Sequence, residues 1–151
     1  MKKHFLLALM FCFAVLVSLC FLLPLYGQDE NTIKLKISAN NRRITVDLYD
    51  SPVTRDLVSL LPLTMDMRDY MQSLKYGYLP RTLSEEGGRR QTTFEAGDVT
   101  YYPSNKEFIL FYKNSVRLRS DHIIIGKITS DLETVRGLSG RIEITVAQAD
   151  E

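Results

Sequence analysis

Alternating apolar and polar residues mark several short segments of this chain. The alternation is complete in the segments 33–37, 44–48 and 142–146. A period of two is typical of strands that bury one face, so these segments are predicted strands. Asn40–Asn41 lies between the first two, and paired asparagines favour a tight turn, so we expect a hairpin there.

Further strands are indicated by β-branched and aromatic residues. They are predicted at 98–102, 107–112 and 123–128. The segment 63–67, Leu-Thr-Met-Asp-Met, is predicted as another strand. The stretch 84–93 is instead polar and contains two glycines, which is typical of a mobile loop. A short helix is expected near the C-terminus over 131–138, where a glycine at 137 or 140 can end it.

An earlier short helix is predicted directly after the second strand. The segment 50–52, Asp-Ser-Pro, combines polar capping residues with a proline suited to a first helical turn. Leu57, Leu60 and Leu61 follow at helical spacing, which indicates a face turned to the core, and Pro62 ends the run. Six to eight short strands with only two helices predict a mainly β fold, a closed barrel that the two short helices cap.

The N-terminus has a different pattern. Lys2 and Lys3 precede an apolar stretch at 5–23, and Pro-Leu-Tyr-Gly follows at 24–27. This order is typical of a secretory signal cleaved after Gly27. The apolar stretch is also long enough for an uncleaved membrane anchor. In both cases we expect residues 28–151 outside the cytoplasm, secreted, periplasmic or held at the outer membrane face, since basic residues stay inside.

A lipoprotein is a third alternative for this segment. It would require a small residue directly before Cys20, where the chain has Leu19. The segment 1–27 therefore makes a signal peptide or membrane anchor, and residues 28–151 make one domain, too short for two ordinary ones. We expect this domain to be a monomer that meets a membrane only through residues 5–23, where these stay uncleaved.

Loss of the N-terminal segment limits the chemistry of the remaining domain. Both cysteines, Cys12 and Cys20, lie in the segment together with His4, so residues 28–151 have His122 as their one histidine. Disulfides, thiolate nucleophiles and Cys/His zinc sites are excluded, and no metal or cofactor is expected. Without Lys2 and Lys3, 17 basic residues face 18 acidic ones, which gives no electrostatic case for nucleic acid.

Two stretches of the chain carry a family resemblance. Residues 44–60 combine a predicted strand, the run Asp-Ser-Pro-Val-Thr and a predicted helix with apolar residues along one face. Residues 118–128 contain the run His-Ile-Ile-Ile-Gly-Lys-Ile. Both resemble segments of cyclophilins, and Phe-Glu-Ala-Gly-Asp at 94–98 is similar to their Gln-Gly-Gly-Asp run. Phrases such as Leu-Leu-Pro-Leu at 60–63 are more similar still to a bacterial and archaeal cyclophilin-like group. The resemblance implies a cyclophilin-like β-barrel over 33–147.

The positions at which this sequence departs from the cyclophilin pattern bear on its activity. Cyclophilins rely on an arginine in a Phe-His-Arg setting to polarise the prolyl amide, and this sequence has no Phe-His-Arg. Arg81 and Arg89 lie in the corresponding region as weak catalytic candidates. Glu95 stands at the glutamine position and Arg117 at the pocket tryptophan position, while His122 aligns with the pocket histidine. The scaffold is matched, and the isomerase residues are largely missing.

Four residues are candidate ligand contacts: Glu95, Tyr112, Arg117 and His122. They supply two charges, an amphipathic ring and an imidazole that titrates near neutrality. Two of them also have a structural interpretation. His122 can be a strand-edge histidine with a hydrogen-bonded neighbour. Glu95 and Asp98 can form a paired-carboxylate site, or Gly97–Asp98 can be only a turn or bulge before a strand.

Alternation also divides the aromatic residues of 107–112 between two faces. Phe108, Leu110 and Tyr112 are expected on one face, and Ile109 and Phe111 on the other. One set must fill the core, and tyrosines are the better candidates for a pocket because their hydroxyl groups favour polar neighbours.

Three functions follow from these observations. The first is an exported cyclophilin-like domain that binds a small molecule or a proline-containing peptide segment without catalysis. The second is a divergent peptidyl-prolyl isomerase for exported proteins, with Arg81 or Arg89 as a relocated electrophile. The third is a purely structural or interaction domain.

Overall fold

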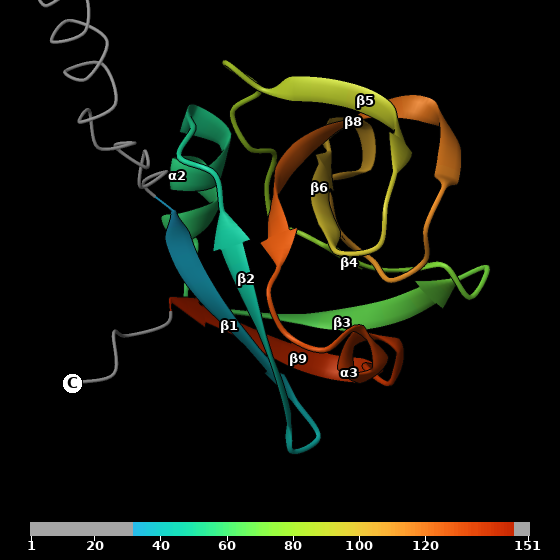
Figure 1. The fold of residues 1–151 in the computed structure, drawn as a ribbon. Coiled ribbons are helices and arrows are strands. Elements are labelled where there is room, and N and C mark those ends of the chain that lie inside the picture. The colour runs from blue at the N-terminus through green and yellow to red at the C-terminus, as the bar shows by residue number, and fades with distance from the viewer. Residues whose placement is uncertain (1–31, 147–151) are drawn as a thin grey trace, which may run out of the picture.

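The computed structural model describes residues 32–146, which form one sheet with two short α-helices (Figure 1). The predicted signal or anchor segment, residues 1–27, lies outside the described residues. Within the described part, no helix has the length and apolar character to span a membrane. The elements in chain order are β1 (Ile33–Ala39), β2 (Arg42–Leu48), α2 (Pro52–Val58), β3 (Leu63–Tyr70), β4 (Leu74–Tyr78), β5 (Arg89–Phe94), β6 (Asp98–Tyr102), a 3-10 turn η1 (Pro103–Asn105), β7 (Glu107–Phe111), β8 (Val116–Ile128), α3 (Leu132–Arg136) and β9 (Gly140–Val146).

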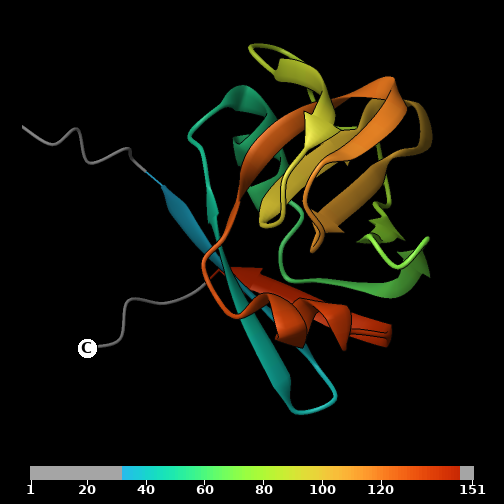
Figure 2. The same cartoon turned by 45° about the vertical axis from the view of Figure 1, so that its right-hand side comes forward.

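Eight of these strands form a ring of hydrogen-bonded neighbours. Their order is β2-β1-β9-β3-β4-β7-β6-β8, and β2 also pairs with β8, so the ring returns to its first strand. At this closure Leu48 lies opposite Gly126. A side chain at Gly126 would place its Cβ 2.4 Å from the Asp47 carbonyl oxygen, so glycine permits the close approach of β2 and β8. The ninth strand, β5, pairs with β8 and lies outside the ring (Figures 1 and 2).

The predicted hairpin is confirmed, and the first helix is confirmed in a shorter form that ends at Val58, before Leu60 and Leu61. Asn40 and Asn41 connect β1 to β2 with φ of 47° and 62°, the left-handed pair that a tight hairpin turn requires. At the start of α2 the Thr54 amide donates to Ser51 Oγ over 3.2 Å, and the Ser51 amide donates to Thr54 Oγ1 over 3.0 Å. This capping box satisfies two groups that a helix end leaves free.

The second predicted helix is confirmed in a shorter form. It covers Leu132–Arg136, with the Thr134 amide donating to Asp131 Oδ2 at its start and Gly137 at its end. The remaining strand predictions also hold, but β8 is longer than expected, because it begins at Val116 instead of Ile123.

Two predictions about local structure are wrong. Residues 89–93 are not a loop, because Arg89–Phe94 forms β5 against β8. The segment Leu74–Tyr78, for which no strand was predicted, forms β4 between β3 and β7. The nine strands of the described residues therefore exceed the expected six to eight.

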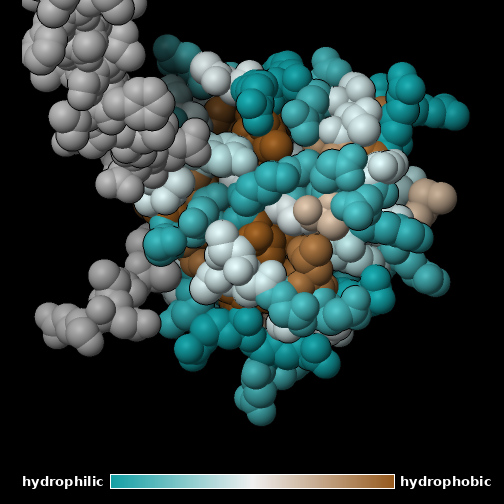
Figure 3. Space-filling model, in the orientation of Figure 1, coloured by the Kyte–Doolittle hydropathy of each residue, from teal (hydrophilic) through white to brown (hydrophobic). Residues whose placement is uncertain are grey.

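The two faces of the ring carry two separate apolar clusters. Phe108, Leu110 and Tyr112 belong to the main core, whereas Ile109 and Phe111 join a second cluster, which confirms the predicted division. The second cluster lies on the outer face of the ring and includes Phe94, which β5 supplies. Figure 3 shows apolar residues visible between polar ones that cover most of the face in that view. The outer cluster provides a floor on which a surface site can be built.

Candidate functional site

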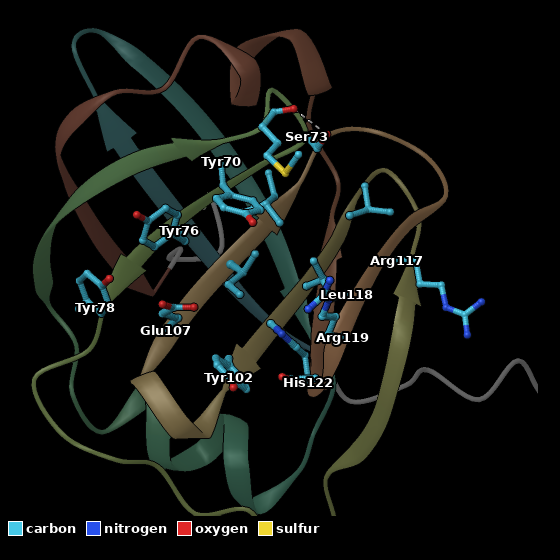
Figure 4. Close-up of a pocket in the computed structure, with 15 residues that line it drawn as sticks. Tyr70, Ser73, Tyr76, Tyr78, Tyr102, Glu107, Arg117, Leu118, Arg119 and His122 are labelled. Atoms are coloured by element: carbon cyan, nitrogen blue, oxygen red, sulfur yellow. Dashed lines mark hydrogen bonds between the residues drawn. The ribbon is translucent and has the colours of Figure 1, made fainter.

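A groove of about 710 Å³ lies on the outer face of the ring, above the second apolar cluster. The β3–β4 hairpin forms one end of it, and Tyr102 and His122, from β6 and β8, lie at the other end (Figure 4). Leu74 and Ile109 belong both to the lining of the groove and to the apolar cluster beneath it. The groove therefore combines an apolar floor with a lining from five strands, β3, β4, β6, β7 and β8.

Tyrosine is the main aromatic residue of the groove. Tyr76 and Tyr78 project from the same face of β4, and their ring centroids are 5.8 Å apart with planes at 88°. Tyr102 stacks on His122, with centroids 4.4 Å apart and planes at 12°. Tyrosine rings offer apolar contact together with a hydroxyl group that can hydrogen-bond. The sequence-based preference for tyrosines as groove residues agrees with this lining.

His122 is the most buried polar residue of the groove. It is 4% exposed, and Phe94 meets its ring edge-on with centroids 5.5 Å apart. Burial lowers the pKa of His122 to about 4, against the opposing charge of Asp121. Its Nδ1 has no hydrogen-bond partner among the described residues. His122 is thus a neutral ring at pH 7, with a buried nitrogen that has no hydrogen-bond partner among the described residues.

The exposed apolar surface concentrates at this groove. Within residues 32–146, the large hydrophobic side chains that are exposed are Tyr70 (49%), Met71 (76%) and Tyr78 (48%), and all three line it. Scattered exposed apolar residues are ordinary, but a grouped set marks a binding surface. The grouping identifies the groove as the candidate functional site.

Strand β8 contains a large bulge where it borders the groove. Gln91 pairs with His122 and Thr93 pairs with Arg117, so the four residues Leu118–Asp121 lie opposite Thr92 alone. These four residues have no register partner in β6 either, whose pairing with β8 begins at Ile123. Such a bulge redirects side chains and is frequent beside functional sites. Here it brings Leu118, Arg119 and Ser120 to the groove wall.

Two of the four predicted ligand contacts lie in this groove. Arg117 and His122 both line it, although Figure 4 shows the Arg117 side chain directed away from Tyr102 and His122. Arg119, which the sequence analysis did not single out, lines the same wall. The bulge explains how three basic or imidazole side chains from one strand reach one surface.

Glu95 lies outside the groove, in a turn between β5 and β6. The Asp98 amide donates to the Glu95 carbonyl over 3.0 Å, and the Glu95 amide donates to Asp98 Oδ2 over 2.8 Å. The carboxylate of Glu95 is exposed and accepts from the Ser115 amide. The predicted turn at Gly97–Asp98 is therefore confirmed. Among the described residues, no group of three or more His, Cys, Asp or Glu side chains could hold a metal.

Tyr112 faces the main core and a different hollow. Its hydroxyl donates to Asp69 Oδ2 over 2.7 Å, and Lys75 Nζ lies 2.8 Å from the same oxygen. Burial, followed by the bond to Asp69, raises the pKa of Tyr112 to about 12. The hydroxyl of Tyr112 is therefore engaged by Asp69, outside the groove.

The two catalytic candidates also lie away from the groove. The guanidinium of Arg81 makes two contacts with the Asp56 carboxylate, at 2.5 and 3.1 Å, and a third with Ser59 Oγ. Arg89 is exposed on β5, opposite Ile124. Neither side chain lines the groove.

The site residues missed from the sequence are Tyr70, Met71 and Arg119. Tyr70 and Met71 became groove residues because β4 forms a hairpin with β3, and that strand was not predicted. To predict Arg119 as a groove residue would have required knowledge of the bulge in β8. Had β4 been predicted, the pair Tyr70 and Met71 at the turn between β3 and β4 would have been the available signal for an exposed apolar site.

The ring of antiparallel strands, its two helices and a groove on its outer face define a β-protein of the cyclophilin type. The chain belongs to the cyclophilin-like family, whose model matches residues 37–147. The solution structure of the hypothetical protein AF2241 from Archaeoglobus fulgidus is similar, with a TM-score of 0.66 and 21% identity over 80% of this chain and 99% of that one.

The structure of McbB in complex with tryptophan also shares the fold. Its TM-score is 0.58 at 12% identity, over 78% of this chain and 46% of McbB. The comparison with curated proteins found no match. The resemblance drawn from the sequence motifs is confirmed at the level of family.

Proposed function

We propose that this protein is an exported cyclophilin-like barrel that binds a proline-containing peptide segment or a small ligand in the outer groove, without catalysing prolyl isomerisation. The observation that carries this proposal is the gathering of Tyr70, Met71 and Tyr78, the exposed large hydrophobic residues of the described part, around one groove. Soluble surfaces rarely group such residues without a partner. Export rests on the N-terminal pattern of Lys2, Lys3 and the apolar stretch at 5–23.

The chemistry of the groove supports a ligand that is partly apolar and partly anionic. Tyrosine rings and Ile109 suit proline rings and other apolar groups, since proline-rich segments dock into aromatic grooves in a preformed extended shape. Arg117 and Arg119 supply positive charge on the β8 side. McbB, with a similar fold, was solved with tryptophan, which makes an aromatic small molecule a reasonable second probe.

The placement of the arginines supports binding without isomerisation. A cation near the prolyl nitrogen would weaken the partial double bond of the amide and lower its barrier. Arg81 is engaged by Asp56, and Arg89 projects from β5, so both proposed electrophiles are remote from the groove lining.

The proposal is tested with the peptide succinyl-Ala-Ala-Pro-Phe-amide and the full chain in phosphatidylcholine nanodiscs. We expect binding by isothermal titration calorimetry, and at least a fivefold loss of affinity in Tyr102→Ala relative to Tyr49→Ala, outside the groove. In a protease-coupled assay on the corresponding p-nitroanilide, we expect no acceleration at high protein concentration. Acceleration that disappears in an Arg81→Ala, Arg89→Ala double variant would establish the isomerase instead.

A further inference from the structure

Two hairpins of this protein contain the same unusual backbone but different residues. In the β1–β2 hairpin, Asn40 and Asn41 both have positive φ. In the β3–β4 hairpin, Met71 and Gln72 have φ of 52° and 51°, and the Ser73 amide donates to the Tyr70 carbonyl over 3.1 Å. Asparagine adopts this left-handed region readily, whereas methionine and glutamine do so rarely. The second turn is therefore held in a conformation its residues disfavour.

Nearby side chains hold the second turn in place. The Gln72 amide donates to Asp69 Oδ1 over 2.9 Å, and Ser73 Oγ donates to the Met71 carbonyl over 3.0 Å. Asp69 is itself bound by Lys75 and by the Tyr112 hydroxyl. A backbone conformation of this kind persists only where its surroundings enforce it, and it is frequent at ligand contacts. These contacts therefore fix the backbone of the hairpin tip and, with it, the position of Met71.

Packing within the protein does not explain the position of Met71. Its side chain is 76% exposed, whereas Met65 and Met67 on the same hairpin are 6% and 2% exposed and fill the main core. Met71 instead lines the groove together with Tyr70. Figure 4 shows Tyr70 and Ser73 at one end of the groove, with Tyr102 and His122 at the other. The tip therefore forms an end wall of the site.

We propose that the hairpin tip, Tyr70–Ser73, is a recognition lip that selects peptide segments carrying an aromatic side chain, which lies against Met71 and Tyr70. This proposal rests on the binding function proposed above and names the ligand class of that groove. A thioether is polarizable, adapts to the shape of its partner and makes favourable contacts with aromatic rings. Arg117 and Arg119, on the β8 wall, complement an acidic group at another position of the same peptide.

A reciprocal exchange between the two hairpins tests the lip. The first variant, Met71→Asn with Gln72→Asn, gives the second turn the residues of the first. The control, Asn40→Met with Asn41→Gln, makes the opposite exchange in a hairpin that does not line the groove. Both are compared with the unchanged full chain in phosphatidylcholine nanodiscs. The probes are succinyl-Ala-Ala-Pro-Phe-amide and its matched partner succinyl-Ala-Ala-Pro-Ala-amide.

The first variant is expected to raise Tm by about 2–4 °C, because asparagine tolerates the left-handed region. It is also expected to weaken binding of the Phe peptide about fivefold, with less than a twofold change for the Ala peptide. The control is expected to lower Tm and to leave both affinities unchanged. A gain in stability with a selective loss of binding separates a ligand contact from a structural role.

Each other outcome counts against the lip. A first variant with lowered Tm would show that Met71 stabilises the fold, and equal losses for both peptides would remove the aromatic selectivity. Unchanged affinity for the Phe peptide would overturn the lip and leave the groove as a binding site. If the unmodified chain binds neither peptide, the groove proposal and the lip fall together.

Discussion

The imidazole of His122 lies flat against the phenol ring of Tyr102, with centroids 4.4 Å apart and planes at 12°. Phe94 covers a second side of the imidazole, and the side chain is 4% exposed. Burial therefore lowers the pKa of His122 to about 4, although the nearby Asp121 opposes the shift. The stacked pair joins β6 to β8 at one end of the groove, so its protonation affects both the fold and the site.

Stability is expected to fall as pH decreases through the range set by His122. The pKa in the folded state is about 4 and the usual value is 6.5, so the unfolded chain binds the proton more tightly. The contribution of the neutral ring is complete above pH 6.5 and is lost progressively down to pH 4, by up to about 3 kcal/mol. The free energy of unfolding of the full chain, compared with His122→Phe between pH 7 and pH 4, measures the difference. A His122 Cε1 proton resonance that titrates near pH 6.5 would contradict the burial of the ring.

Removing positive charge from the β8 wall is expected to weaken binding of an anionic peptide. Arg117→Ala and Arg119→Ala should each reduce affinity for succinyl-Ala-Ala-Pro-Phe-amide about threefold to tenfold and flatten its dependence on salt, since exposed charges are screened. The measurement is a titration at two salt concentrations. Arg89→Ala, at an exposed position of β5 that does not line the groove, is the matched control and should change neither quantity.

Much of the fold could be predicted because alternation is a local signal. The division of Phe108 and Leu110 from Ile109 and Phe111 follows from period two alone, and the structure places the two sets in separate clusters. Strand β4 was missed although Leu74, Tyr76 and Tyr78 alternate, because glycine is disfavoured inside strands and a lysine is rarely buried. Lys75 is buried through its ion pair with Asp69, and Gly77 packs closely against Met65, whose Sδ would lie 2.5 Å from a Cβ at this position. Both contacts are tertiary, so the local sequence of β4 does not reveal them.

The candidate site was predicted in part for the same reason. Arg117 and His122 lie on one strand, so a local motif could bring them together. Tyr112 and Glu95 depend on register and on a turn. The alternation of β7 carries Tyr112 to the inner face, and the hydrogen-bonded turn with Asp98 leaves Glu95 exposed outside the groove. The bulge at Leu118–Asp121 exists only because β5 pairs with β8, a pairing that no local pattern indicates.

The Asp56–Arg81 pair is expected to stabilise the fold without affecting the groove. The Arg81 side chain and the Ser84 amide lower the pKa of Asp56 to about 2 by hydrogen bonding to its carboxylate. This contribution is present above pH 3.8 and is lost as pH falls toward 2; with solvent screening it amounts to about 1 kcal/mol. Arg81→Ala should lower the free energy of unfolding by this amount at pH 7. Peptide affinity should be unchanged, and an affinity loss would place Arg81 in the binding machinery.

The closure of the ring at β2 and β8 depends on Gly126. A Cβ at this position would lie 2.4 Å from the Asp47 carbonyl oxygen and 3.0 Å from Leu48 Cα, and both are backbone atoms that cannot rotate away. Gly126→Ala must therefore separate the strands at Leu48, where the last ring pairing is made.

For Gly126→Ala we expect a loss of about 2–3 kcal/mol in the free energy of unfolding, the size typical of overpacking. Hydrogen exchange should accelerate at the Tyr49 amide, which donates to the Ile125 carbonyl beside this contact. Ser38→Ala is the control and should change neither the free energy nor that exchange rate, because Ser38 pairs with Arg43, at the end of the β1–β2 ladder away from Leu48. Equal stability of Gly126→Ala and the unmodified chain would mean that β2 and β8 tolerate a wider spacing, and that the ring does not depend on this contact.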